Sequence, residues 1–251
     1  MTCCLVVALP GVSLAAADTR TGIEHSEGQL IHDGPDDLRI HVAFGKTVVV
    51  PYKYRKMRHL GDGWAVGAGE FVSLQKLLDR LKENGSSQFT QAKRLIQERS
   101  QILESVKAEV GIAEEQLLKT IILGAPLGID VGVWSIGLRD NDPRTNPRIG
   151  EYAINWPFEV PLPIQQQKNQ ELTNNLLSAH ATHNTLALVK AVARVVGVAN
   201  EYSDKVGPLV QVGISVANPE GGYQALYIDD SIVNILALTN AEFLQRAESA
   251  G

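Results

Sequence analysis

An apolar hairpin at the start of the chain constrains the fold more than any other feature. Two apolar runs, residues 3–9 and 12–17, flank a Pro10-Gly11 pair. A Pro-Gly dipeptide between two strand-like runs is a turn signal, so this stretch predicts a buried β-hairpin. Because a hairpin brings its two ends together, we expect Thr2 at its start to lie beside Asp18 at its end.

The position of Thr2 suggests a nucleophile. Met1 is a candidate for removal because the side chain that follows it is small. The free α-amine of Thr2 would then stand next to its own hydroxyl and can act as the base for it. The sequence therefore predicts an N-terminal threonine nucleophile with Asp18 as an acidic neighbour.

A second interpretation of the same residues is a secretory signal. Residues 15–17 are three alanines, which suit a cleavage site after an apolar core. However, no Lys or Arg precedes the apolar run, as a signal peptide requires. Cleavage there would remove Thr2 and end the catalytic interpretation.

Composition and charge limit the class of protein. The chain has 251 residues, 44% hydrophobic and 20% charged, which fits one globular domain spanning residues 1–251. A net charge of −5 argues against a nucleic-acid partner. No apolar run approaches the roughly 20 residues of a membrane span. The only two cysteines are adjacent, which fits a reducing compartment, so we expect a cytoplasmic protein without a membrane partner.

Residues 56–70 form the second anchor of the functional interpretation. Lys56 precedes a short strand, a Gly-Asp-Gly turn, a second strand and a Gly-Ala-Gly bend before a helix. A buried ammonium near Thr2 would lower the proton affinity of its hydroxyl, and Asp18 would balance the charge. A backbone N–H at the start of a helix is a ready donor to an oxyanion. The competing interpretation of Lys56 is a strand-edge lysine that faces water.

Together, residues 2–20 and 56–82 resemble proteasome β-type subunits and their bacterial HslV- or Anbu-related relatives, which are N-terminal-nucleophile hydrolases. The family's nucleophile and acidic partner stand sixteen positions apart, as Thr2 and Asp18 do. The resemblance implies that Lys56 is the catalytic lysine. It also implies that Gly69 donates to the oxyanion, with Gly67 as the alternative.

The resemblance continues, with departures, at residues 200–216. Ser203 matches the serine that hydrogen-bonds the N-terminal amine, although a helix-ending serine also has an ordinary capping explanation. Asn200 stands where the family has an aspartate, and Asp204 is a candidate replacement for that carboxylate. The family's other serine, ahead of the second helix pair, has no counterpart in this sequence.

The remaining pattern predicts an α+β fold. Apolar periodicity indicates helices at about 71–81, 86–109, 165–180, 185–201 and 240–250, with a further helical turn at 113–118. It indicates strands at 38–44, 47–52, 120–123, 131–138, 151–156, 208–216 and 224–228, which residues 231–233 would prolong. This order predicts two stacked antiparallel sheets with helix pairs outside, the four-layer αββα sandwich of the resembled family.

Three further segments are given no catalytic role. Residues 21–54 read as an extended hairpin insertion whose first part, 21–37, is polar and turn-rich. Residues 140–149 read as a plain loop because they lack EF-hand spacing. His180 and His183 suit surface or capping positions better than a metal, since no Glu follows the first histidine as in zinc-protease helices.

By resemblance, we expect a threonine peptidase that needs no metal or organic cofactor. Its substrates would be peptides or unfolded proteins, and its assembly a homo-oligomeric ring or helical stack with an unfoldase as a further partner. Two alternatives stay open. The acyl-enzyme could pass to an amine, as in a transpeptidase or amidase. The chain could instead be a non-catalytic assembly subunit, which the missing serine and Asn200 favour.

Overall fold

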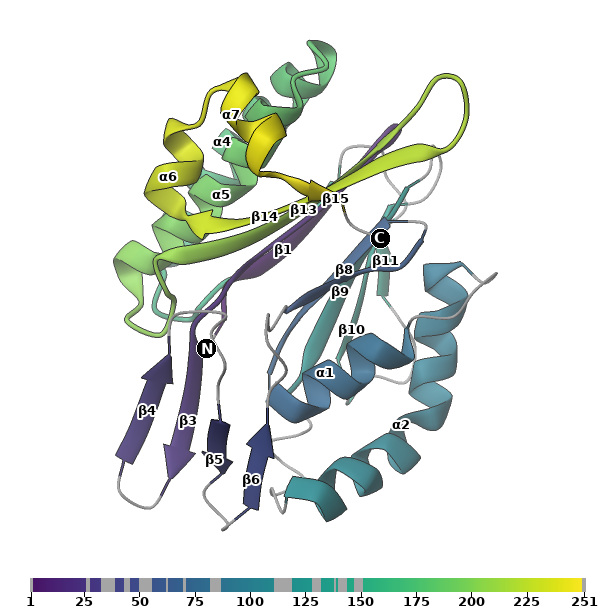
Figure 1. Cartoon of the computed structure of the whole chain (residues 1–251), viewed down its shortest axis with the longest axis vertical. Helices are drawn as coiled ribbons and strands as arrows, with labels where there is room; N and C mark the ends of the chain where they lie inside the picture. The colour runs from purple at the N-terminus through teal and green to yellow at the C-terminus, as the bar shows by residue number, and fades with distance from the viewer. Residues whose placement is uncertain are drawn as a thin grey trace.

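Two antiparallel sheets lie face to face, with helices covering the outer face of each (Figure 1). The computed structural model describes residues 2–25, 28–32, 39–42, 46–49, 56–61, 63–69, 71–81, 87–110, 119–127, 132–137, 139, 144–146 and 151–249. This arrangement confirms the α+β class and the four-layer order of helices, sheet, sheet and helices.

The first sheet contains the hairpin that opens the chain. Its strand order is β12-β1-β2-β13-β14-β15. The bounds are β1 Cys4–Leu9, β2 Val12–Asp18, β12 Glu151–Asn155, β13 Leu209–Ala217, β14 Tyr223–Ser231 and β15 Glu248–Ser249. In the hairpin, Cys4 lies opposite Ala17 and Leu9 lies opposite Val12. Gly11 turns the chain with φ +69°, a conformation that glycine adopts without steric cost.

The second sheet has the order β11-β10-β9-β8-β7. Its bounds are β7 Met57–His59, β8 Gly63–Ala68, β9 Ile121–Pro126, β10 Val133–Gly137 and β11 Arg144–Asn146. The predicted strands at 120–123 and 131–138 therefore form, although β11 lies inside a segment expected to be a plain loop. That three-residue strand pairs with β10, a long-range contact that the polar local sequence does not indicate.

Side-chain alternation explains why β1 and β2 are apolar throughout. Cys3, Leu5 and Val7 belong to the cluster beneath the helices, whereas Cys4 and Val6 belong to the cluster between the sheets. Successive side chains of a strand point to opposite faces, so a strand covered on both sides must be apolar at every position. The hairpin thus separates the apolar cluster beneath the helices from the apolar cluster between the two sheets.

Helices cover both outer faces (Figure 1). On the first sheet lie α4 Leu162–Ala181, α5 Thr185–Tyr202, α6 Ile232–Ala237 and α7 Asn240–Arg246; on the second lie α1 Phe71–Arg80 and α2 Gln88–Val110. Ser87, one of two predicted caps of α2, accepts a hydrogen bond from the Thr90 N–H (3.3 Å). No helix in the described part of the chain is long and apolar enough to cross a bilayer.

Specific contacts fix the spacing of the two sheets. Ser13 Oγ on β2 donates to the Ala125 carbonyl oxygen (2.5 Å) and accepts from the Trp64 N–H (3.1 Å). A Cβ added to Gly213 would lie 2.5 Å from the Trp64 ring, so only glycine fits there. Small residues on the first sheet therefore receive a large ring from the second.

Two short hairpins follow β2. β3 Thr21–His25 pairs with β4 Gly28–His32, and β5 Arg39–Val42 pairs with β6 Lys46–Val49. The second hairpin matches the predicted strands at 38–44 and 47–52. The first lies in the polar stretch 21–37, where no individual strand was predicted, and residues 26–27 and 33–37 of that stretch lie outside the described residues.

Three boundaries differ from the sequence analysis. α4 begins at Leu162 rather than Gln165, because Pro163 lies in its first turn, where a missing N–H costs nothing. Ile232 and Val233 begin α6 instead of prolonging a strand, since Ser231 Oγ caps that helix by accepting from the Asn234 N–H (3.1 Å). The closing helix ends at Arg246, and β15 follows it. The predicted helical turn at 113–118 lies outside the described residues.

Candidate active site

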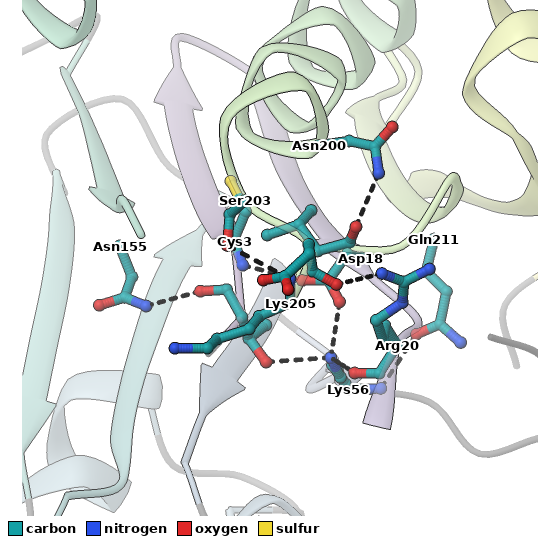
Figure 2. Close-up of polar contacts among 12 residues, drawn as sticks. Cys3, Asp18, Arg20, Lys56, Asn155, Asn200, Ser203, Lys205 and Gln211 are labelled. Carbon is teal, nitrogen blue, oxygen red and sulfur yellow. Dashed lines mark hydrogen bonds and ion pairs between the residues drawn. The ribbon is translucent and has the colours of Figure 1, made fainter. Parts of the chain in front are cut away.

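Thr2 and Asp18 come together at the Lys56 ammonium, where the first sheet meets the second. Figure 2 shows Asp18 beside Lys56. The Lys56 ammonium donates to Thr2 Oγ1 (3.0 Å) and to Asp18 Oδ2 (3.0 Å). Its third hydrogen bond goes to the Arg20 carbonyl oxygen (2.7 Å). A lysine ammonium has three N–H groups, so these three acceptors satisfy it completely.

The ion pair at the centre of this group is shielded from water. The side chains of Lys56 and Asp18 are 4% and 0% exposed, whereas Thr2 is half-buried. Burial raises the pKa of Asp18 above its ordinary value, and the Lys56 ammonium and the Cys3 N–H act against that rise. The structure thus corrects the water-facing alternative for Lys56.

The main chain of Lys56 is held by both sheets. Its N–H donates to Gln211 Oε1 on β13 (2.9 Å), and its carbonyl oxygen accepts from the Gly67 N–H on β8 (3.0 Å). Gln211 is itself fully buried and donates through Nε2 to Asp229 Oδ2 (3.2 Å). The ammonium therefore projects from a backbone position that cannot shift without breaking contacts in both sheets.

The two candidate oxyanion donors are in different situations. Gly67 already uses its N–H in the bond to Lys56, which argues against it as a donor to substrate. Gly69 lies beyond the last residue of β8 and before α1, with φ +139°. A Cβ there would lie 2.4 Å from the Thr120 Cα, so the position requires glycine for steric reasons.

Ser203 is buried at the end of α5, near the site but with a role of its own. Its hydroxyl oxygen accepts from the Lys205 N–H (3.3 Å), the local geometry of a helix-ending serine. Asn200 donates through Nδ2 to the Val206 carbonyl oxygen (2.6 Å) and so supports the same turn. Asp204 is exposed, and its carbonyl oxygen accepts from the Arg20 guanidinium.

Three residues that shape the site were not predicted as site residues from the sequence. Asn155 on β12 donates through Nδ2 to the Thr2 carbonyl oxygen (2.8 Å). Gln211 fixes the Lys56 backbone, and Arg20 links Lys56 to the turn after α5. Gln211 carried a signal, since it is a polar residue between apolar neighbours in a strand covered on both faces. Arg20 closes the stretch of residues 2–20 that carries the family resemblance.

Other reactive side chains near the site are inert. Burial raises the pKa of the Cys3 thiol well above its usual value and that of Cys4 to about 12, and the Asp18 carboxylate adds to both shifts. Neither thiol is a thiolate nucleophile near neutral pH.

The two histidines lie at the end of α4. His183 has φ +50° beyond the end of that helix, and His180 Nε2 is hydrogen-bonded to the Pro10 carbonyl oxygen (2.9 Å). In the described part of the chain, no group of three His, Cys, Asp or Glu side chains is placed to hold a metal ion.

Comparisons with known proteins bear on the fold. No protein-family profile and no curated protein matches this sequence. Among solved structures, Anbu (ancestral β-subunit) from Yersinia bercovieri aligns over 93% of this chain and 92% of its own, with 12% identity and a TM-score of 0.54. The Gly-1 mutant of Anbu from Hyphomicrobium sp. strain MC1 aligns over 98% and 97%, with 12% identity and a TM-score of 0.50.

A third solved structure, Thiobacillus denitrificans BPH in complex with epoxomicin, aligns over 86% of this chain and 100% of its own. Its identity is 15% and its TM-score 0.47. The two Anbu structures agree with the resemblance drawn from residues 2–20 and 56–82. The chain therefore has the fold of Anbu, the ancestral β-subunit of the proteasome type.

Proposed function

We propose that this protein is a threonine-type amide hydrolase that cleaves peptide bonds, with Thr2 as the N-terminal nucleophile after removal of Met1. One observation carries the proposal. A buried ammonium lies 3.0 Å from the Thr2 hydroxyl oxygen and 3.0 Å from a buried carboxylate. A cation beside a hydroxyl lowers the pKa of that hydroxyl, which is one of the ways in which a nucleophile is activated.

The hydrogen bond from Lys56 to Thr2 Oγ1 supports the α-amine as the base. An ammonium that donates to Thr2 Oγ1 cannot also accept the hydroxyl proton. Asp18 is occupied by Lys56 and by the Cys3 N–H (2.8 Å). The α-amine of Thr2, created when the Met1–Thr2 bond is cut, is then the base.

The proposed reaction proceeds in two halves. Thr2 Oγ1 attacks the substrate carbonyl carbon as its proton passes to the α-amine, directly or through water. The Gly69 N–H stabilises the oxyanion. The tetrahedral intermediate collapses, the C–N bond breaks, and the α-ammonium gives its proton to the leaving amine. Water then attacks the ester carbonyl carbon and gives a proton to the α-amine. The ester C–O bond breaks, the α-ammonium returns the proton to Thr2 Oγ1, and the carboxylic acid leaves.

The neighbouring groups support these steps. Lys56 lowers the proton affinity of the Thr2 hydroxyl through its positive charge. Asp18 keeps that charge in place, because an unpaired ammonium at this depth would be strongly disfavoured. Ser203 is proposed to fix the α-amine, in addition to its bond within the turn after α5.

The assembly and substrate are proposed from the fold. Peptides or unfolded proteins are the expected substrates, and a homo-oligomer, as a ring or helical stack, is the expected assembly. An unfoldase partner and a cytoplasmic location complete the proposal. Neither a nucleic acid nor a membrane is among the proposed partners.

Covalent labelling tests the nucleophile. In the wild-type protein, an electrophilic threonine-protease probe should add its mass to the N-terminal peptide, and intact mass should show that Met1 is absent. Thr2→Ala should abolish labelling and turnover, whereas Thr2→Ser, which retains a hydroxyl, should keep part of both. Labelling that persists in Thr2→Ala refutes the assignment.

A non-catalytic assembly subunit is the second candidate, and two contacts favour it. Ser203 and Asn200 both have local roles in the turn after α5, so neither needs an active site to explain it. Retention of Met1 together with an unlabelled Thr2 would support this candidate. Acyl transfer to an amine is separated from hydrolysis by assaying the products with and without an added amine acceptor.

A further inference from the structure

The carbonyl of Thr2 is bound by a side chain rather than by the sheet. Thr2 precedes β1, whose first residue, Cys4, lies opposite Asn155 on β12. Instead of a backbone N–H, Asn155 Nδ2 donates to the Thr2 carbonyl oxygen (2.8 Å) (Figure 2). The amide side chain thus extends the sheet by one contact beyond the end of its ladder.

The same peptide unit is held at its other end. The Cys3 N–H, which belongs to the peptide that joins Thr2 to Cys3, donates to Asp18 Oδ1 (2.8 Å). Asn155 therefore binds the C=O and Asp18 binds the N–H of one planar peptide. With the plane fixed at both ends, the direction of the Thr2 Cα–C bond is set, and with it the place from which the amine and hydroxyl project.

The strand that carries Asn155 is held from two sides. β12 pairs with β1 through a register that runs from Cys4–Asn155 to Ala8–Glu151. On its other side, Asn169 of α4 accepts from the Trp156 indole N–H at Oδ1 (3.2 Å) and from the Tyr152 hydroxyl at its carbonyl oxygen (3.2 Å). The strand that carries Asn155 is thus held by β1 and, through its neighbours Trp156 and Tyr152, by α4.

We propose that Asn155 is a positioning residue for the Thr2 nucleophile, which it holds by clamping the Thr2–Cys3 peptide against Asp18. The inference rests on the proposed function of Thr2. Asn155 does not touch the reacting atoms. It fixes the residue that carries them, and misplacement by about 1 Å costs on the order of 100-fold in rate.

Asn155→Asp provides a test that a merely structural role would not pass. At neutral pH the carboxylate of this variant can only accept hydrogen bonds, so it repels the Thr2 carbonyl oxygen. The protonated acid can donate a hydrogen bond to that oxygen, as the amide does. The protonated fraction rises about tenfold per pH unit on acidification until the carboxyl pKa is reached. The ratio of kcat in Asn155→Asp to kcat in wild type should therefore rise steeply as the pH falls from 7.5 to 5.

Asn155→Leu, which cannot donate at any pH, should give a low ratio that does not change with pH. We expect kcat to fall about 10-fold to 100-fold with KM within about twofold, the pattern of a misplaced nucleophile. The matched controls are Asn174→Asp and Asn174→Leu, on the exposed face of α4, which should follow wild type throughout. Melting temperatures of the two Asn155 variants should stay within a few degrees of each other.

The outcomes separate the two proposals. If Thr2→Ala is inactive but the Asn155→Asp ratio is flat, Asn155 does not position Thr2, although Thr2 remains the nucleophile. A change in KM alone would likewise overturn the positioning role. If Thr2→Ala keeps full activity, or wild type has none, both proposals fall.

Discussion

Lys56→Met removes the ammonium while keeping a side chain of similar length. In its absence Asp18, which is 0% exposed, loses its ion pair and keeps the hydrogen bond from the Cys3 N–H. Breaking a buried ion pair by removing one partner costs about 3 to 5 kcal/mol, because the other charge is left without compensation. We therefore expect the free energy of unfolding of Lys56→Met to fall by about that amount at neutral pH.

The loss should depend on pH in a defined direction. Burial raises the pKa of Asp18 and Lys56 counteracts that rise, so the variant moves the pKa further up. A folded-state pKa above the unfolded value of about 3.9 means that the folded protein holds a proton that the unfolded chain has released. The stability of Lys56→Met should therefore fall as the pH rises through this window, by about 1.4 kcal/mol per unit.

Urea unfolding at a fixed protein concentration measures this effect. The control is Lys168→Met, whose pair with Glu171 (2.7 Å) is exposed and should contribute less than about 1 kcal/mol. Asp18→Asn combined with Lys56→Met should recover part of the loss, because a neutral pair leaves no buried charge. If Lys56→Met costs no more than Lys168→Met at neutral pH, the ammonium does not compensate a buried carboxylate, and the electrostatic argument fails.

Two further predictions concern the glycine and the thiols. Gly69→Ala should lower the free energy of unfolding by about 1 to 3 kcal/mol and abolish turnover, because it combines an unfavourable φ with contact to the Thr120 backbone. The control is Gly61→Ala, which should cost less because Gly61 has φ +83° but open space around it. Equal losses of stability in thermal unfolding would contradict the steric argument. Cys3 and Cys4 should resist iodoacetamide in the native protein at neutral pH and react after denaturation, since burial raises the pKa of both thiols. Mass spectrometry measures the alkylation, and rapid alkylation of the native protein would show that the hairpin opens readily.

Local sequence patterns predicted the elements that depend on local chemistry. The Pro10-Gly11 turn and the apolar runs around it led to β1 and β2, and the proposed pairing of Thr2 with Asp18 followed from the hairpin alone. The periodic apolar residues of α1, α2 and α5 were equally informative. In each case the burial that stabilises the element is visible as a period in the sequence.

Long-range contacts were beyond that reasoning. Asn155 reaches Thr2 across 153 positions, and no local pattern distinguishes it from any other asparagine at a strand end. β11 and β15 form because neighbouring strands offer free edges, although their own residues are polar. Ile232 and Val233 favour a strand by composition, but the Ser231 cap and the burial of Ile232 in the cluster beneath the helices make them helical.

The anchoring of Lys56 between Gln211 and Gly67 has a consequence for how the protein becomes catalytically active. The Thr2 hydroxyl and the Asp18 carboxylate belong to the hairpin of the first sheet, whereas the main chain of Lys56 is hydrogen-bonded to both sheets. Any sliding of one layer over the other would pull the three groups apart before it unfolded either layer. Activity would then report on the alignment of the two halves, and it would be the last property gained in folding and the first lost under stress.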